Sequence, residues 1–78
     1  MKQYIDKAIT ELQQKTLNAI QQETARVWAG RACAAVSLGL WPDAVEYAHE
    51  SIEHAALSGN DALLREVRLV MKQFGVEV

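Results

Sequence analysis

The chain has 78 residues, half of them apolar but only 6% aromatic, and it carries a formal net charge of −2. This length suits one small domain, and the acidic balance leaves no basic stripe for non-specific binding of nucleic acid. A single cysteine excludes an internal disulfide, and no apolar run is long enough to predict a signal peptide or a membrane span. We therefore expect one soluble, cytoplasmic domain over residues 1–78 that binds neither nucleic acid nor a membrane.

The first predicted element is an amphipathic helix over about residues 3–20. The segment contains no glycine or proline, and most of its apolar side chains recur at helical spacing. These side chains are Ile5, Ala8, Ile9, Leu12, Leu17 and Ile20. Residues 21–24 interrupt the pattern without a strong stop signal, and Thr24 is the only candidate N-cap for a second helix over about 25–38. The two helices are therefore either separated by a kink at this point or continuous.

The later helix ends are marked more clearly. Gly39 stands where a left-handed residue ends a helix, and Pro42 suits the first turn of the next one. The Ser-Gly-Asn-Asp segment at 58–61 provides a further stop and an N-cap, and Gly75 ends the last helix. The sequence thus predicts an all-α fold of antiparallel hairpins with about four helices, over about residues 3–20, 25–38, 42–57 and 61–73.

The segment from about residue 25 to 56 resembles a tetratricopeptide repeat. Trp28 falls at the first aromatic position of the repeat, Ala32 at its small position, Gly39 and Trp41 at its turn, and Ala44 at the small contact of its second helix. The chain departs from the family pattern at four positions. Arg31 stands where Leu is usual, Ala35 where Tyr is usual, Ala48 where a large aromatic residue is usual, and Ala56 where Pro is usual. The resemblance implies one complete repeat flanked by two half repeats in a right-handed stack.

In this family the first helix of each repeat lines a concave groove. The resemblance places groove residues in the complete repeat and in the last helix. They are Arg26, Ala29, Cys33, Val36 and Ser37, and then Arg65, Leu69, Lys72 and Gln73. It implies a non-enzymatic interaction module, adaptor or chaperone-like, that binds an amphipathic helix or an extended peptide, with an acidic residue of the partner meeting Arg65 or Lys72. The alternative is that these residues are ordinary surface.

The small and the aromatic residues of this segment have packing roles that do not depend on the family. Ala32 and Ala44 allow two helix axes to approach to the low end of about 8–10 Å. Trp28 and Trp41 are expected to fill the space above and below that contact as core residues. The alternative for Trp41, which lies beside the turn, is an exposed position as an anchor for a partner.

The sequence predicts no metal or cofactor site. His49 and His54 are five positions apart and diverge by about 140° around a helix, so they do not converge on one ion. Glu46 and His49 have the spacing used in di-iron bundles, but no second such pair is present. We expect a solvated acidic face with two pairs spaced four residues apart, His49 with Glu53 and Glu50 with His54.

Enzymatic activity is not predicted either. The sequence has no nucleophile elbow, phosphate loop or paired acids. Cys33 is flanked by alanines that supply neither a base nor a positive charge, so a packed thiol is favoured over a reactive one. We expect no catalytic residue.

The apolar faces of the first and last helices exceed what a short stack can bury. These faces comprise Ile5, Ile9 and Leu12 at one end and Leu63, Val67, Val70 and Phe74 at the other. Closed two-fold pairing is the commonest way to cover such a surface, so we expect a homodimer. An alternative function is therefore a self-assembling structural protein. An alternative fold is a closed bundle in which the first helix folds back onto the last.

Overall fold

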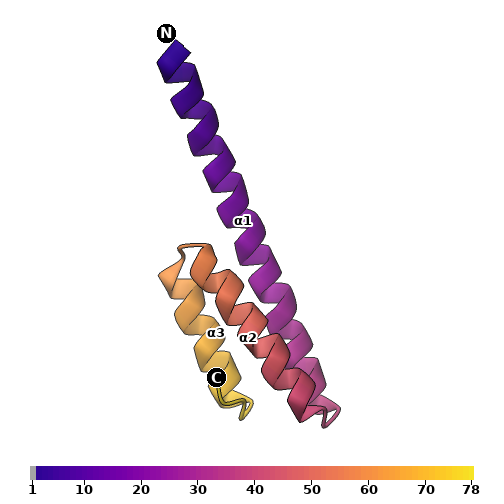
Figure 1. Cartoon of the computed structure of the whole chain (residues 1–78). Coiled ribbons are helices and arrows are strands. Elements are labelled where there is room, and N and C mark those ends of the chain that lie inside the picture. Colours follow the sequence, from indigo (N-terminus) through magenta and orange to yellow (C-terminus); the bar gives the residue numbers. More distant parts are fainter. Residues whose placement is uncertain (1) are drawn as a thin grey trace.

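A computed structural model describes residues 2–78 and contains three helices, and no strand occurs in that range (Figure 1). They are α1 (Lys2–Ser37), α2 (Trp41–Leu57) and α3 (Asp61–Gln73). Helix α2 returns along the C-terminal half of α1, and α3 packs beside α2 and also contacts α1. The prediction of an all-α fold is confirmed, whereas the prediction of about four helices is wrong.

The two helices expected before Gly39 are one continuous helix. Thr24 caps nothing: it lies inside α1, and its hydroxyl donates to the Ile20 carbonyl four residues earlier, at 2.8 Å. Residues 21–24 contain no glycine or proline, so the intrahelical hydrogen bonds continue through them. Of the two alternatives left by the sequence, a kink or a continuous helix, the structure has the continuous helix.

The N-terminal half of α1 projects beyond the rest of the molecule. The molecule measures 57 × 17 × 12 Å, and its long dimension follows α1 (Figure 1). Every residue from position 3 to 17 is exposed. The closed bundle, in which this segment would fold back onto the last helix, does not form.

The turns follow the local signals of the sequence. Gly39 has φ +73°, the Gly39 amide donates to the Val36 carbonyl, and the Leu40 amide donates to the Ala35 carbonyl. This pair of hydrogen bonds is the Schellman arrangement that closes a helix C-terminus. Pro42 occupies the first turn of α2, as predicted, and the Asn60 side chain caps α3 by accepting from the amide of Leu63 at 3.0 Å.

Gly39→Val should lower the free energy of unfolding by more than about 1 kcal/mol, because a β-branched residue is strained at positive φ. A Cβ at Gly39 would meet no atom within 4 Å, so the cost is purely conformational. Gly30→Ala is the matched control, since Gly30 is helical and equally open; it should stabilise the fold by about 0.5–1 kcal/mol. An unchanged urea midpoint for Gly39→Val would contradict the prediction.

Small side chains form the contact between α1 and α2. The buried residues of this contact are Ala25, Ala32 and Ala35 on α1 and Ala44, Ala48, Ser51 and Ala55 on α2. The expected close contact through Ala32 and Ala44 is consistent with this, since both residues are fully buried. The larger core side chains come from α3 and the residues after it, namely Leu63, Val67, Met71 and Val76.

The tryptophans are less buried than predicted. Trp28 is half-buried; its ring lies 5.5 Å from that of Tyr47, and the Arg31 guanidinium lies 4.9 Å from the ring centre. Trp41 is 46% exposed, so its assignment to the core is wrong. It begins α2 beside the hairpin turn, and its indole lies close to the turn at Gly75.

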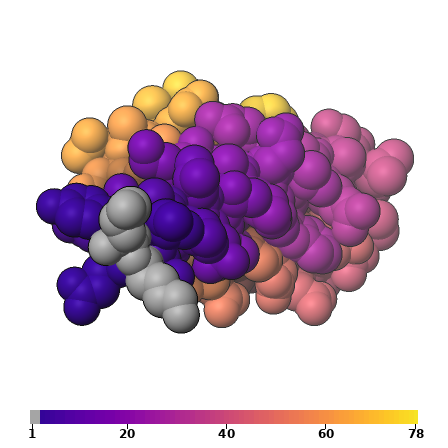
Figure 2. All heavy atoms as spheres, turned by 90° about the horizontal axis from the view of Figure 1, so that it is seen from above, coloured from indigo at the N-terminus to yellow at the C-terminus, as the bar shows by residue number. Residues whose placement is uncertain are grey.

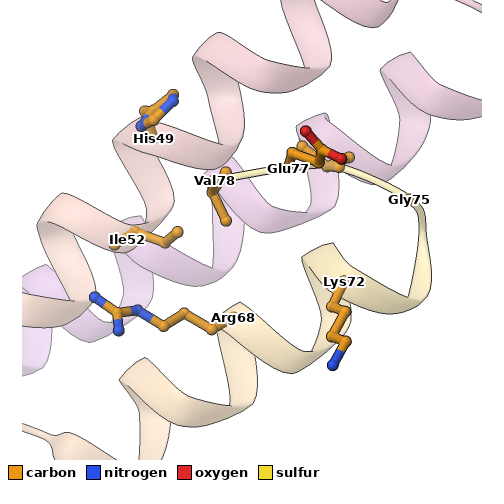
Figure 3. Close-up of a pocket in the computed structure, with 8 residues that line it drawn as sticks. His49, Ile52, Arg68, Lys72, Gly75, Glu77 and Val78 are labelled. Carbon is orange, nitrogen blue, oxygen red and sulfur yellow. The ribbon is translucent and has the colours of Figure 1, made fainter.

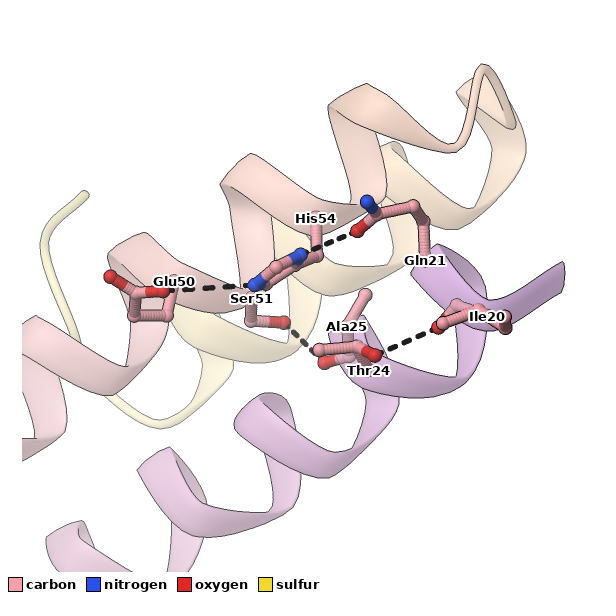
Figure 4. Close-up of polar contacts among 7 residues, drawn as sticks. All are labelled: Ile20, Gln21, Thr24, Ala25, Glu50, Ser51 and His54. Atoms are coloured by element: carbon pink, nitrogen blue, oxygen red, sulfur yellow. Dashed lines mark hydrogen bonds and ion pairs between the residues drawn. The ribbon is translucent and has the colours of Figure 1, made fainter. Parts of the chain in front are cut away.

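One buried hydrogen bond fixes how α2 lies on α1. The Ser51 hydroxyl, fully buried, donates to the Ala25 carbonyl at 2.7 Å (Figure 4). This carbonyl lies in the middle of α1, so the bond joins the two helices directly. A hydroxyl buried here without its partner would carry the full cost of its desolvation.

Ser51→Ala should destabilise the fold by about 0.5–1.5 kcal/mol, the usual net contribution of one hydrogen bond. Ser37→Ala is the control, because the exposed Ser37 hydroxyl donates only within its own helix, to the Cys33 carbonyl. Thermal unfolding followed by circular dichroism measures both variants. Equal losses in the two would show that the bond between α1 and α2 contributes nothing.

Candidate interaction surface

A continuous row of exposed positions runs along one face of α1. Residues spaced three or four apart share a face of a helix. The row, which we call the outer stripe, consists of Ile5, Ile9, Leu12, Thr16, Ile20, Glu23, Val27, Gly30 and Ala34. All of these residues are exposed, and the four large side chains before Glu23 are between 48% and 63% exposed.

The outer stripe faces away from α2 and α3. Ala25 and Ala32 are fully buried, and each is two positions from a stripe residue, Val27 or Gly30, which is about half a turn of helix. Val27 is 49% exposed, and a Cβ built on Gly30 would meet no atom within 4 Å. No helix of the described chain therefore covers this face.

The N-terminal part of the stripe is hollowed slightly. A shallow depression on α1 is lined by Ile9, Leu12, Gln13, Thr16 and Leu17. Figure 2, a view from above, has the N-terminal end of α1 in the foreground and α2 and α3 behind it. The depression is mostly apolar and belongs to a single helix, so it can receive side chains of a partner but does not enclose a small molecule.

The first five predicted groove residues all lie on the C-terminal half of α1, but in three different surroundings. Arg26 and Ala29 line a small hollow together with residues of α3, which are Leu63, Glu66, Val67 and Val70. Cys33 and Val36 are half-buried and pack against the core, and Ser37 is exposed at the end of α1. This half of the predicted set lies on one helix, but only Arg26 and Ala29 meet α3 in a hollow.

The four predicted groove residues of α3 lie elsewhere. Lys72 lines a different hollow, between α2, α3 and the last residues of the chain, and Arg65, Leu69 and Gln73 line neither hollow. Helix α3 buries Val67 against the core, and Arg65 and Leu69 are each two positions from it, about half a turn away. The structure therefore does not bring the nine residues together in one groove.

The hollow around Lys72 combines basic and apolar side chains. Its lining includes His49, Arg68 and Lys72 and one carboxylate, that of Glu77 (Figure 3). The apolar part of the lining consists of Ile52, Val76 and Val78. In Figure 3 the Lys72 side chain points away from His49 and Val78, so the positive charges do not converge on one point.

The histidines take part in contacts between and within helices. His54 Nδ1 is hydrogen-bonded to Gln21 Oε1 of α1, and His54 Nε2 lies 3.7 Å from Glu50 Oε2 (Figure 4). The predicted Glu50 and His54 pair is confirmed. His49 lines the hollow around Lys72 instead. Within residues 2–78, no three histidine, cysteine or acidic side chains gather as metal ligands would.

Cys33 has the surroundings of a packed thiol. Burial raises the pKa of the Cys33 thiol, and a backbone hydrogen bond opposes this rise only in part. The thiol is therefore protonated at neutral pH, and thiolate chemistry is disfavoured.

Sequence reasoning identified only the beginning of the outer stripe. It ended the first helix at residue 20, so Ile5, Ile9 and Leu12 were expected to need cover, whereas Val27, Gly30 and Ala34 were not connected with them. The apolar pattern gave no continuous signal, because Thr16, Glu23 and Gly30 interrupt it between Ile5 and Ala34.

None of the helices in residues 2–78 is both long enough and apolar enough to span a bilayer. Comparison with known proteins finds no matching family model, no similar curated protein and no solved structure that matches this chain.

Proposed function

We propose that this chain is a non-enzymatic protein–protein interaction module that binds a partner helix along the outer stripe of α1. The observation that carries the proposal is that large apolar side chains on half of a 36-residue helix have no intramolecular cover. A helix of that kind is marginal in water by itself, because most helical stability in proteins comes from packing of its apolar face. Binding a partner supplies that packing.

The geometry of the stripe suits a helix better than any other ligand. A partner helix would find anchors at i, i+3, i+4 and i+7, which is the pattern used when helices pair in grooves and coiled coils. Between Ile5 and Val27 the stripe is about 33 Å long, at 1.5 Å of rise per residue. Large exposed apolar side chains that recur over this length on a small protein favour an interaction site.

A second candidate is peptide binding at the hollow between α1 and α3. Its floor is apolar, formed by Leu63, Val67 and Val70, and Arg26 and Glu66 supply charges of opposite sign at its rim. This arrangement accepts a side chain of an extended peptide, the partner that the tetratricopeptide resemblance implies. The hollow is smaller than the outer stripe, so we rank it second.

Capture of proteins from an extract of the native cells on the immobilised chain tests the proposal. Leu12→Asp should abolish capture, because it places a charge in the middle of the stripe. Leu57→Asp is the matched control: it makes the same change on a side chain of similar exposure, 59% against 63%, at the end of α2. Arg26→Glu reports on the second candidate. Capture of the same proteins by the wild type and all three variants would contradict both candidates.

A further inference from the structure

We infer that the helix bound by the outer stripe is α1 of a second copy of this chain, running antiparallel, with the N-terminal half of each α1 on the C-terminal half of the other. The inference rests on the proposed function and specifies its partner. It is carried by the sizes and charges of the side chains along the stripe and by the symmetry of their spacing.

The stripe is self-complementary in side-chain size. Its N-terminal half has large residues and its C-terminal half has smaller ones. The register that places Leu12 opposite Val27 also places Ile9 opposite Gly30 and Ile5 opposite Ala34. This match follows from the spacing, because the stripe residues are separated by four, three and four positions whether they are counted forwards from Ile5 or backwards from Ala34. Gly30 and Ala34 allow close approach of two helix axes, and the open space over Gly30 receives Ile9.

The same register is closed and symmetric. Its two-fold axis passes between the two copies beside Ala19 and Ile20, so eight of the nine stripe residues pair with stripe residues of the other copy and Ile20 faces Ala19. Isologous pairing of this kind is the commonest arrangement of soluble homo-oligomers. The contact spans residues 5–34, about 44 Å of helix and about four heptads, with Thr16, Glu23 and Gly30 among its otherwise apolar positions.

Charges beside the stripe favour the antiparallel direction. In this register Thr16 lies opposite Glu23, so Lys15 of one copy comes beside both Glu23 and the like-charged Arg26 of the other. On the other side of the stripe, Asp6 of one copy comes within about one turn of Arg31 of the other. Parallel pairing in register would separate both pairs along the helix axes, because Lys15 and Glu23 are eight positions apart and Asp6 and Arg31 are 25 positions apart. Rim charges contribute little affinity, but they select orientation.

Sedimentation of the wild-type chain at micromolar concentration should give the mass of two chains. Gly30→Glu should give one chain with unchanged helix content, since glutamate favours helix but puts a charge opposite Ile9. Gly30→Ala and Leu57→Asp should both remain two chains, because alanine still fits under Ile9 and Leu57 lies outside the stripe. A wild-type mass of one chain would overturn the inference.

Single cysteines introduced into a Cys33→Ala background test the direction and register. Ala19→Cys, close to the two-fold axis, should link two chains on mild oxidation. Leu12→Cys should not, because its two copies would lie about 22 Å apart, beyond the roughly 7 Å between Cα atoms that a disulfide spans. Efficient linking through Leu12→Cys would indicate parallel helices and overturn the inference.

These outcomes are separable from failure of the proposed function. A chain that stays a monomer, or pairs in parallel, overturns the antiparallel partner but leaves the stripe as a binding surface if Leu12→Asp still abolishes capture. If Leu12→Asp changes neither the mass nor the capture, both the inference and the proposed function are overturned.

Discussion

Met71→Ala should lower the free energy of unfolding by about 2–5 kcal/mol, the usual cost of truncating a buried methionine and leaving a cavity. Met71 is fully buried and is the largest side chain of which this is true. A domain of 78 residues has a total stability of about 4–12 kcal/mol. The substitution therefore removes a large share of the total free energy of unfolding.

Leu69→Ala is the control for this variant. Leu69 lies on the same helix and is 56% exposed, so its truncation should change stability by less than about 0.5 kcal/mol. Urea unfolding of both variants provides the comparison, with an unchanged slope indicating that only the native state is affected. A loss in Met71→Ala no larger than in Leu69→Ala would show that α3 is not anchored through Met71.

Ala48→Leu is expected to cost about 1–3 kcal/mol or more, because it forces a larger side chain into a closely packed contact. Ala48 is fully buried on the face of α2 that carries Ser51. A leucine there would separate α2 from α1 and lengthen the hydrogen bond from Ser51 to the Ala25 carbonyl. The tetratricopeptide pattern has a large aromatic residue at this position, so the variant also tests how far the resemblance extends to packing.

Ala56→Leu makes the same change at an exposed position of α2, where it should leave the unfolding midpoint nearly unchanged. The difference between the two midpoints isolates packing from helix propensity, which is the same for both substitutions. If both variants unfold at the wild-type midpoint, the helices are free to separate and the small residues between α1 and α2 are not required.

The helix ends are the part of the fold that sequence predicts best. Gly39 and Asn60 act through conformations and hydrogen bonds within a few residues of themselves, so their roles do not depend on the rest of the chain. The periodicity of α2 and α3 likewise reports which side of each helix is buried. Burial of Ala32 and Ala44 agrees with what a close helix contact needs.

The sequence did not predict the continuity of α1 or the position of Trp41. Thr24 is an acceptable N-cap and an acceptable interior residue, and its hydroxyl bonds to the Ile20 carbonyl only when the helix continues. Trp41 has the composition of a core residue, but its burial depends on whether another helix lies beside the turn. The turn after α3 comes close to its indole, but the side chain remains 46% exposed.

The sequence by itself thus determined an all-α chain, the turns at Gly39 and Gly59, and the apolar character of Ile5, Ile9 and Leu12, because these properties are set by neighbouring residues. Only the tertiary structure decided that α2 and α3 pack on one side of α1, that the apolar side chains on its other face stay uncovered, and that the nine predicted groove residues do not share one groove. The physical reason is that three helices are too few to cover every apolar face, so covering one face of α1 leaves another exposed. Which face of α1 obtains cover is fixed by contacts of Ala25 and Ala32 with residues far along the chain, and these contacts leave no signal in the spacing of α1 itself.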